Sequence, residues 1–234
     1  MNQRNSNLVM KKLSLIHSAY IVFLKDLHVE FRSRYAVNAI FLFAITTLTA
    51  ISFSMGPIRL RSEILAPLLW IILFFSSMSG LAHIFVREEE QQTADTLRLL
   101  TSPNVVFLGK WFFNMVLLFS LEILIVPVFL AMMGAVVGSP GPFIVVIFIG
   151  SLGLASVATL IAAIISQASA KGALFAVLAF PISLPVLISG IHGTQLSMNG
   201  GTFSEGMPDL QVLFSFSIVI LTLSLLLFEF IWRK

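Results

Sequence analysis

Residues 111–170 constrain the fold more than any other part of the chain, because these sixty residues contain a single charged side chain, Glu122. The hydrocarbon core of a bilayer is about 30 Å thick, and a helix crosses it with about 20 apolar residues. The run is therefore too long for one membrane span. Residues 134–142 are rich in glycine and proline, which favour a turn. The run predicts two spanning helices, at 111–134 and 143–166.

The rest of the chain has the same character. Of its 234 residues, 58% are hydrophobic and 11% are charged, whereas soluble domains have about 25% charged residues. Four further uncharged runs predict spans at 36–56, 64–86, 172–189 and 210–232. We therefore expect an all-α polytopic membrane protein, with one six-helix transmembrane domain over residues 36–232. No room remains for a large soluble domain.

Residues 1–35 differ from the spans because charged side chains interrupt them throughout. Apolar residues nevertheless recur every three or four positions, at Leu13, Ile16, Tyr20, Leu24, Leu27 and Phe31. This spacing predicts an amphipathic helix. Such a helix lies in the membrane interface and does not cross the bilayer. We expect a cytoplasmic amino terminus followed by this interfacial helix.

The distribution of basic residues predicts the orientation. With the amino terminus in the cytoplasm, twelve of the fourteen Lys and Arg residues fall on the cytoplasmic side, and only Arg59 and Arg61 fall outside. Cytoplasmic loops of membrane proteins carry such an excess. The sequence therefore predicts that both termini are cytoplasmic. The basic pI of 9.5 reflects these loops and does not indicate binding to nucleic acid.

Several catalytic motifs are missing from the sequence. The chain has no cysteine, which excludes disulfides, thiolate metal sites and cysteine nucleophiles. It has neither the phosphate-binding G-x-x-x-x-G-K-[ST] motif nor the zinc-binding H-E-x-x-H motif. Ser151 lies between two glycines, but their spacing is not that of a hydrolase, and small residues usually serve helix packing. We expect no catalytic or metal site in this chain.

The polar loop at 87–110 predicts a short cytoplasmic helix that ends before Pro103. Acidic side chains crowd its first turn and a basic one lies near its end, where the helix macrodipole favours each. A small apolar face is formed by Ala94, Leu97 and Leu100. This face suits a helix that docks into a groove of another protein. It equally suits a solvated connector that packs on its own bundle, and the pattern alone leaves both open.

Glu122 is the candidate polar residue inside the membrane. It follows Lys110 by twelve residues, or about 18 Å along a helix, which is near the middle of the bilayer. A carboxylate at that depth is a functional candidate. The alternative is a protonated side chain bonded to local backbone or Ser120 near a kink at Pro127. In the fifth span, Pro181 and Pro185 predict a broken helix enclosed by protein.

The arrangement of helices resembles the permease subunits of ABC-2 type transporters. More specific are the run from Phe74 to Glu88, the segment Leu97 to Leu100, Pro103, the Gly109-Lys110 pair, and Phe180-Pro181 with Pro185. In order and spacing, these resemble CcmB, the haem exporter protein B family of cytochrome c maturation. The resemblance extends from about Leu13 to the end of the chain.

The resemblance implies a non-catalytic permease subunit in the bacterial inner membrane, with haem as the candidate substrate. ATP would be bound by a separate CcmA-like ATPase, and the other partners would be a haem-handling CcmC-like protein and a small CcmD-like protein. The ATPase-docking residues would be Glu88, Glu89, Glu90, Ala94, Asp95, Leu97, Arg98 and Leu100.

His192, in the polar segment between the last two spans, is a candidate haem contact, because histidine is a common axial ligand. The alternative is an ordinary loop residue. Two other functions stay open for the whole chain. One is an ABC-2 permease for another amphiphile, such as a lipid, a polysaccharide or a drug. The other is a non-transporting scaffold of the maturation machinery.

Overall fold

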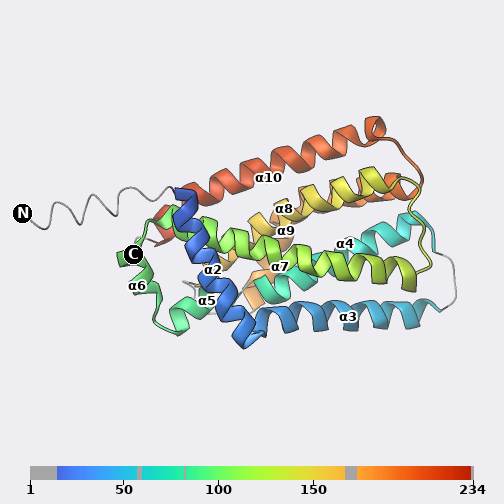
Figure 1. Ribbon diagram of the computed structural model, residues 1–234. Coiled ribbons are helices and arrows are strands. Elements are labelled where there is room, and N and C mark those ends of the chain that lie inside the picture. Colours follow the sequence, from blue (N-terminus) through green and yellow to red (C-terminus); the bar gives the residue numbers. More distant parts are fainter. Residues whose placement is uncertain (1–14, 57–59, 82, 167–172, 233–234) are drawn as a thin grey trace, which may run out of the picture.

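The computed structural model describes residues 15–56, 60–81, 83–166 and 173–232, and every regular element in these residues is a helix. Six helices are long and apolar enough to cross a membrane, which confirms the predicted all-α polytopic class. They run lengthwise through the molecule (Figure 1). Their bounds are α3 (Tyr35–Met55), α4 (Ser62–Leu81), α7 (Pro103–Met132), α8 (Pro140–Ser166), α9 (Ala173–Met198) and α10 (Phe203–Trp232).

Helix α8 forms the centre of the bundle. It packs against α4, α7, α9 and α10. Most of α8 is buried inside the bundle, whereas most of α3 is exposed on its outside. The prediction that the fifth span is broken at its prolines is wrong, although α9 does pack against α4, α8 and α10. Helix α9 continues through Pro181 and Pro185, and Pro181 lies on an exposed face together with Val177 and Leu184.

Three helices extend well beyond their predicted spans, and one of them, α10, begins at Phe203 and not at residue 210. Helix α7 begins at Pro103 and not at residue 111, because proline is well suited to the first turn of a helix. Helix α9 continues to Met198, so the predicted polar segment at 190–209 is mostly helical, and residues 199–202 alone connect it to α10. A helix of 30 residues is about 45 Å long, which exceeds the bilayer core. The predicted start of the fifth span, residue 172, lies outside the described residues.

The interfacial helix α2 (Leu15–Ser33) crosses one end of the bundle (Figure 1). Its buried residues are Ala19, Val22, Asp26 and Glu30. Most of the predicted apolar stripe faces away from the bundle, since Ile16, Tyr20, Leu24 and Phe31 are exposed. Leu27 of the same stripe packs partly against the core, and Leu13 lies outside the described residues. The helix therefore buries small and acidic side chains fully against the protein and leaves most of its large apolar side chains exposed.

The predicted helix in the 87–110 loop is divided in two. Helix α5 (His83–Glu90) is followed by a turn, and α6 (Ala94–Leu100) begins after it. Gln92 in this turn has φ of 55°, a left-handed conformation that interrupts a helix. Backbone hydrogen bonds from Gln92 to Glu89 and from Thr93 to Glu88 close the turn. Helix α6 thereby turns away from α5 and lies at the extreme end of the molecule (Figure 1).

Candidate coupling site

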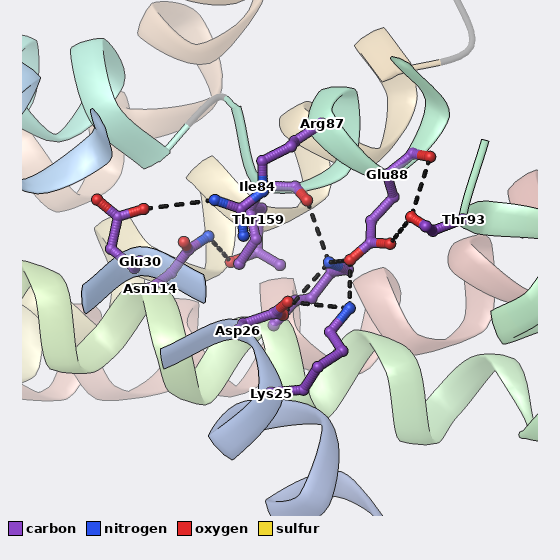
Figure 2. A network of polar contacts seen from close by, with 10 residues as sticks. Lys25, Asp26, Glu30, Ile84, Arg87, Glu88, Thr93, Asn114 and Thr159 are labelled. Atoms are coloured by element: carbon purple, nitrogen blue, oxygen red, sulfur yellow. Dashed lines mark hydrogen bonds and ion pairs between the residues drawn. The ribbon is translucent and has the colours of Figure 1, made fainter. Parts of the chain in front are cut away.

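Four charged side chains from three helices meet where α2 crosses the bundle. We call them the charge cluster: Lys25 and Asp26 from α2, Glu88 from α5 and Lys110 from α7 (Figure 2). Asp26 and Lys110 have no exposed surface and Glu88 is 4% exposed. Two cations and two carboxylates balance, so the cluster carries no net formal charge. Buried charges are tolerated when they are paired in this way.

Lys110 is the centre of the charge cluster. Its ammonium group lies 3.3 Å from Asp26 Oδ2, 3.1 Å from Glu88 Oε1 and 3.1 Å from the carbonyl oxygen of Ile84. An ammonium group has three N–H donors, and each has an acceptor here. Lys110 also lies over the ring of Phe85, with Nζ 5.2 Å from the ring centroid. The cation is thus fully satisfied without water.

Glu88 joins the charge cluster to the turn before α6. Its Oε1 accepts hydrogen bonds from Lys110 and Lys25, and its Oε2 accepts one from the hydroxyl of Thr93. Lys25 is 39% exposed. Burial lowers the pKa of Lys25, but Asp26 and Glu88 outweigh this effect and hold the pKa above its ordinary value. Lys25 therefore stays charged at neutral pH, and its ion pairs would be lost only in strongly alkaline solution.

A glycine allows α2 to approach α7 closely enough for these contacts. A Cβ atom at Gly109 would lie 2.6 Å from Val22 Cβ and 2.8 Å from the carbonyl oxygen of Ala19. These distances are too short for two atoms that are not bonded. Gly109 therefore places α2 directly on α7, and the next residue, Lys110, reaches Asp26.

A second ion pair lies beside the cluster. Glu30 Oε2 is 3.5 Å from Arg87 Nη1, and Glu30 Oε1 accepts a hydrogen bond of 3.0 Å from the backbone N–H of Val37 at the start of α3. Figure 2 shows Arg87 and Glu88 pointing from one helix toward different partners on α2. Consecutive residues of α5 thus bind oppositely charged side chains of α2, Arg87 an acid and Glu88 the cation of Lys25.

Four aromatic rings continue the site toward α10. Phe228 lies 5.3 Å from Phe85 and 5.3 Å from Phe107 between ring centroids, and 5.2 Å from Trp232. The guanidinium of Arg98 in α6 lies 4.9 Å above the Trp232 ring, within the range of a cation–π interaction. Arg98 also forms ion pairs with Glu89 at 2.8 Å and Asp95 at 2.7 Å. It therefore binds α6 to the bundle.

The structure divides the predicted docking residues into buried and exposed groups. Glu88 and Ala94 are buried, so these two cannot belong to an exposed docking surface. Leu97 packs partly against the hydrophobic core and Arg98 turns to Trp232, and both are half-buried. The prediction of one outward face is wrong for Ala94, because the turn at Gln92 reorients α6 and buries this residue. The exposed apolar residues of α6 are Leu99 and Leu100, at 88% and 62%. Of these two, Leu99 is not among the docking residues predicted from the sequence. The remaining docking candidates stay at the periphery, with Glu89 partly exposed and Glu90 and Asp95 exposed.

Glu122 lies inside the bundle and is 6% exposed. Its partner is the hydroxyl of Ser151 in α8. The expected local partner is wrong, because Ser120 donates its hydroxyl hydrogen to the carbonyl oxygen of Leu117 instead. Two more polar contacts join the same two helices, from Trp111 to Ser156 and from Asn114 to Thr159, each at 2.8 Å. Glu122 thus belongs to a series of polar contacts between α7 and α8.

His192 lies on α9 near the opposite end of the bundle, not in a loop. Its Nδ1 is 2.7 Å from Asp209 Oδ2 of α10, and its side chain is 64% exposed. The pair joins the two helices beside their short connection. The carboxylate orients the imidazole and leaves Nε2 on the other side of the ring.

Comparison with known protein families finds one described as CcmB protein, whose model matches residues 17–230. This range includes the charge cluster, α5, α6, Glu122 and His192. Comparison with curated proteins finds no match.

Proposed function

Because the chain belongs to the CcmB family, we propose that it is the membrane subunit through which a separate ATPase drives haem export for c-type cytochrome biogenesis. The family is one of membrane permeases in ABC systems for haem export. The match over residues 17–230 is the observation that carries the proposal. The six apolar helices agree with it, since a permease subunit needs helices that can span a membrane.

The proposal places the protein in the bacterial inner membrane with both termini in the cytoplasm. The excess of Lys and Arg predicted for the cytoplasmic side supports this orientation. Helices α2, α5 and α6 and the carboxyl-terminal end of α10 lie at one end of the bundle (Figure 1). A cytoplasmic ATPase would meet this end.

Helix α6 is the proposed docking element for the ATPase. It presents Leu99 and Leu100 to the outside while Ala94, Leu97 and Arg98 hold it to the bundle. Exposed adjacent leucines suit a hydrophobic groove in a partner. Each fully buried leucine contributes about 1.5–3 kcal/mol, so the two together suffice for a specific contact.

The experiment is the double variant Leu99→Ala with Leu100→Ala in the chain co-expressed with its ATPase. We expect normal membrane levels, at least about tenfold weaker ATPase copurification and a matching fall in holocytochrome yield. Leu226→Ala with Leu227→Ala is the matched control, because these adjacent leucines are also exposed but lie on α10. Wild-type ATPase copurification by the Leu99 and Leu100 variant would contradict docking through α6.

The remaining partners in this proposal are a haem-handling CcmC-like membrane protein and a small CcmD-like membrane protein. The family belongs to a system with an ATPase and other membrane partners. Identification of the polypeptides that copurify with the solubilised chain tests these two partners. Haem-dependent ATPase turnover in the reassembled complex distinguishes the haem permease from a permease for another amphiphile and from a scaffold.

His192 is proposed to contact haem at the outer end of the bundle. Histidines that bind a metal usually donate their other ring N–H to a carboxylate, and Asp209 is placed to accept from Nδ1. Nε2 would then reach the haem iron. Titration of the purified complex with ferric haem tests the contact. We expect His192→Ala to remove a Soret shift that His28→Ala retains.

A further inference from the structure

The short helix α6 has few contacts of its own with the bundle. It contains seven residues, too few for an isolated helix to be stable in water. Of these seven, only Ala94 is buried, and Leu97 and Arg98 are half-buried. Apolar packing therefore contributes little to the orientation of α6, and polar contacts at its two ends have to hold it.

The contact at the carboxyl-terminal end leads to α10. It consists of Arg98, which stacks on Trp232 and pairs with Glu89. The contact at the amino-terminal end consists of Thr93, the residue before α6. Its hydroxyl binds Glu88 Oε2, and its backbone N–H binds the carbonyl oxygen of Glu88 at 3.0 Å.

The second carboxylate oxygen of Glu88 binds Lys110 of α7 and Lys25 of α2 (Figure 2). One rigid carboxylate thus joins the start of α6 to two other helices. Lys110 has no exposed surface and no spare donor, so it cannot exchange Glu88 for water or another acceptor. A displacement of α6 must therefore either carry Glu88 and its two cations along or break the hydrogen bond from Thr93 to the Glu88 carboxylate. Glu88 cannot follow α6 alone, because that would break a buried charge pair.

We propose that Thr93 and Glu88 are positioning residues that make α6, α7 and the interfacial helix α2 move together when the ATPase engages α6. This inference rests on the proposed function. It assigns α2 a part in coupling, because its buried Asp26 and partly exposed Lys25 complete the charge cluster. The Arg98–Trp232 contact transmits the same displacement separately to α10.

Thr93→Val is the sharpest test, because it removes one hydroxyl and leaves all four charges of the cluster in place. Thr96→Val is the matched control, since Thr96 lies exposed on α6, three residues after Thr93. Thr93→Ser restores the hydroxyl and should restore function. The chain contains no cysteine, so cysteines introduced at His28 in α2 and at Thr101, directly after α6, accept spin labels without background.

The distance between these two labels is measured by pulsed electron paramagnetic resonance in the complex with the ATPase, with and without a non-hydrolysable ATP analogue. We expect one narrow distance in both states for the parent chain, the Thr96→Val control and Thr93→Ser. We expect a broadened distance for Thr93→Val. A hydrogen bond to a charged acceptor is lost, so the ordered fraction of α6 should fall about tenfold or more relative to the disordered one.

Two further readouts separate coupling from docking. Thr93→Val should copurify the ATPase at the parent level but yield about tenfold less holocytochrome. An unchanged distance distribution and parent yield would overturn the inference. Loss of ATPase copurification in Thr93→Val would also overturn it, because the contact would then serve docking. Failure of the proposed function is recognised differently, by a parent chain that copurifies no ATPase or by Leu99 and Leu100 variants that bind it normally.

Discussion

At the scale of single residues, we expect the loss of Lys110 to lower the stability of the fold most. It is a fully buried cation whose three acceptors come from α2 and α5. Its removal would leave the two buried carboxylates of Asp26 and Glu88 with a single cation, Lys25, between them. Lys25 offers a comparison within the same cluster, because it pairs with the same two acids but is 39% exposed.

We predict that Lys110→Met destabilises the solubilised protein by about 3–5 kcal/mol, the range for breaking a buried ion pair. Lys25→Met should lower stability by about 1 kcal/mol or less, because water can replace its contacts. Thermal unfolding in detergent measures both. Equal effects of the two substitutions would show that burial of Lys110 is not the cause.

Glu122 leads to a prediction about function inside the membrane. We expect Glu122→Gln to retain assembly and cytochrome maturation, because the amide can donate a hydrogen bond to Ser151 in α8 and the series of polar contacts between α7 and α8 remains. Copurification of the partners and holocytochrome yield are measured together. Normal assembly with lost maturation would assign a role to the carboxylate. Lost assembly would instead indicate a role in helix packing.

At the scale of helices, the close approach of α2 to α7 depends on Gly109. We predict that Gly109→Ala displaces α2, because the added Cβ would lie 2.6 Å from Val22 Cβ and 2.8 Å from a backbone oxygen. Trypsin should then cleave faster after Lys25. Gly206→Ala is the control, since a Cβ there would meet Leu196 at an ordinary 3.6 Å. Equal cleavage of both variants would contradict this packing argument.

The division between α5 and α6 changes which residues face a partner. A continuous helix would place Ala94, Leu97 and Leu100 on one outward face. The left-handed Gln92 instead directs Ala94 and Leu97 toward the bundle and leaves Leu99 and Leu100 exposed. The helical periodicity is the same in both cases, but the direction of the helix axis differs. For this reason the pattern predicted a helix and not its docking face.

At the scale of the whole molecule, the orientation in the membrane is the prediction to test first. We expect a reporter fused after Lys234 or inserted near Gln92 to lie in the cytoplasm, and one inserted near Asn199 to lie outside. Gln92 and Asn199 are both exposed and lie in connections between helices, so insertion there should leave the bundle intact. A reporter near Gln92 that reads as external would reverse the orientation.

The sequence by itself determined the fold class, because the length and apolarity of each run are local properties that the bilayer selects directly. The six spanning helices followed from this, together with the turn near Gly134 and the amphipathic character of α2. The ends of these helices could not be predicted in the same way, because α7 and α9 extend past the apolar runs that predicted them. Backbone hydrogen bonds continue a helix whether its side chains are apolar or polar.

Only the tertiary structure decided the site. In the sequence, Asp26 and Glu30 belong to the charged side of an amphipathic helix. In the structure both are buried, and they form ion pairs with Lys110 of α7 and Arg87 of α5. The local pattern shows that a charged face exists but not what covers it. That depends on helices far apart in the sequence, since Asp26 and Lys110 are 84 residues apart. Charges can be buried only where such a partner is brought within reach, and helix packing alone decides this.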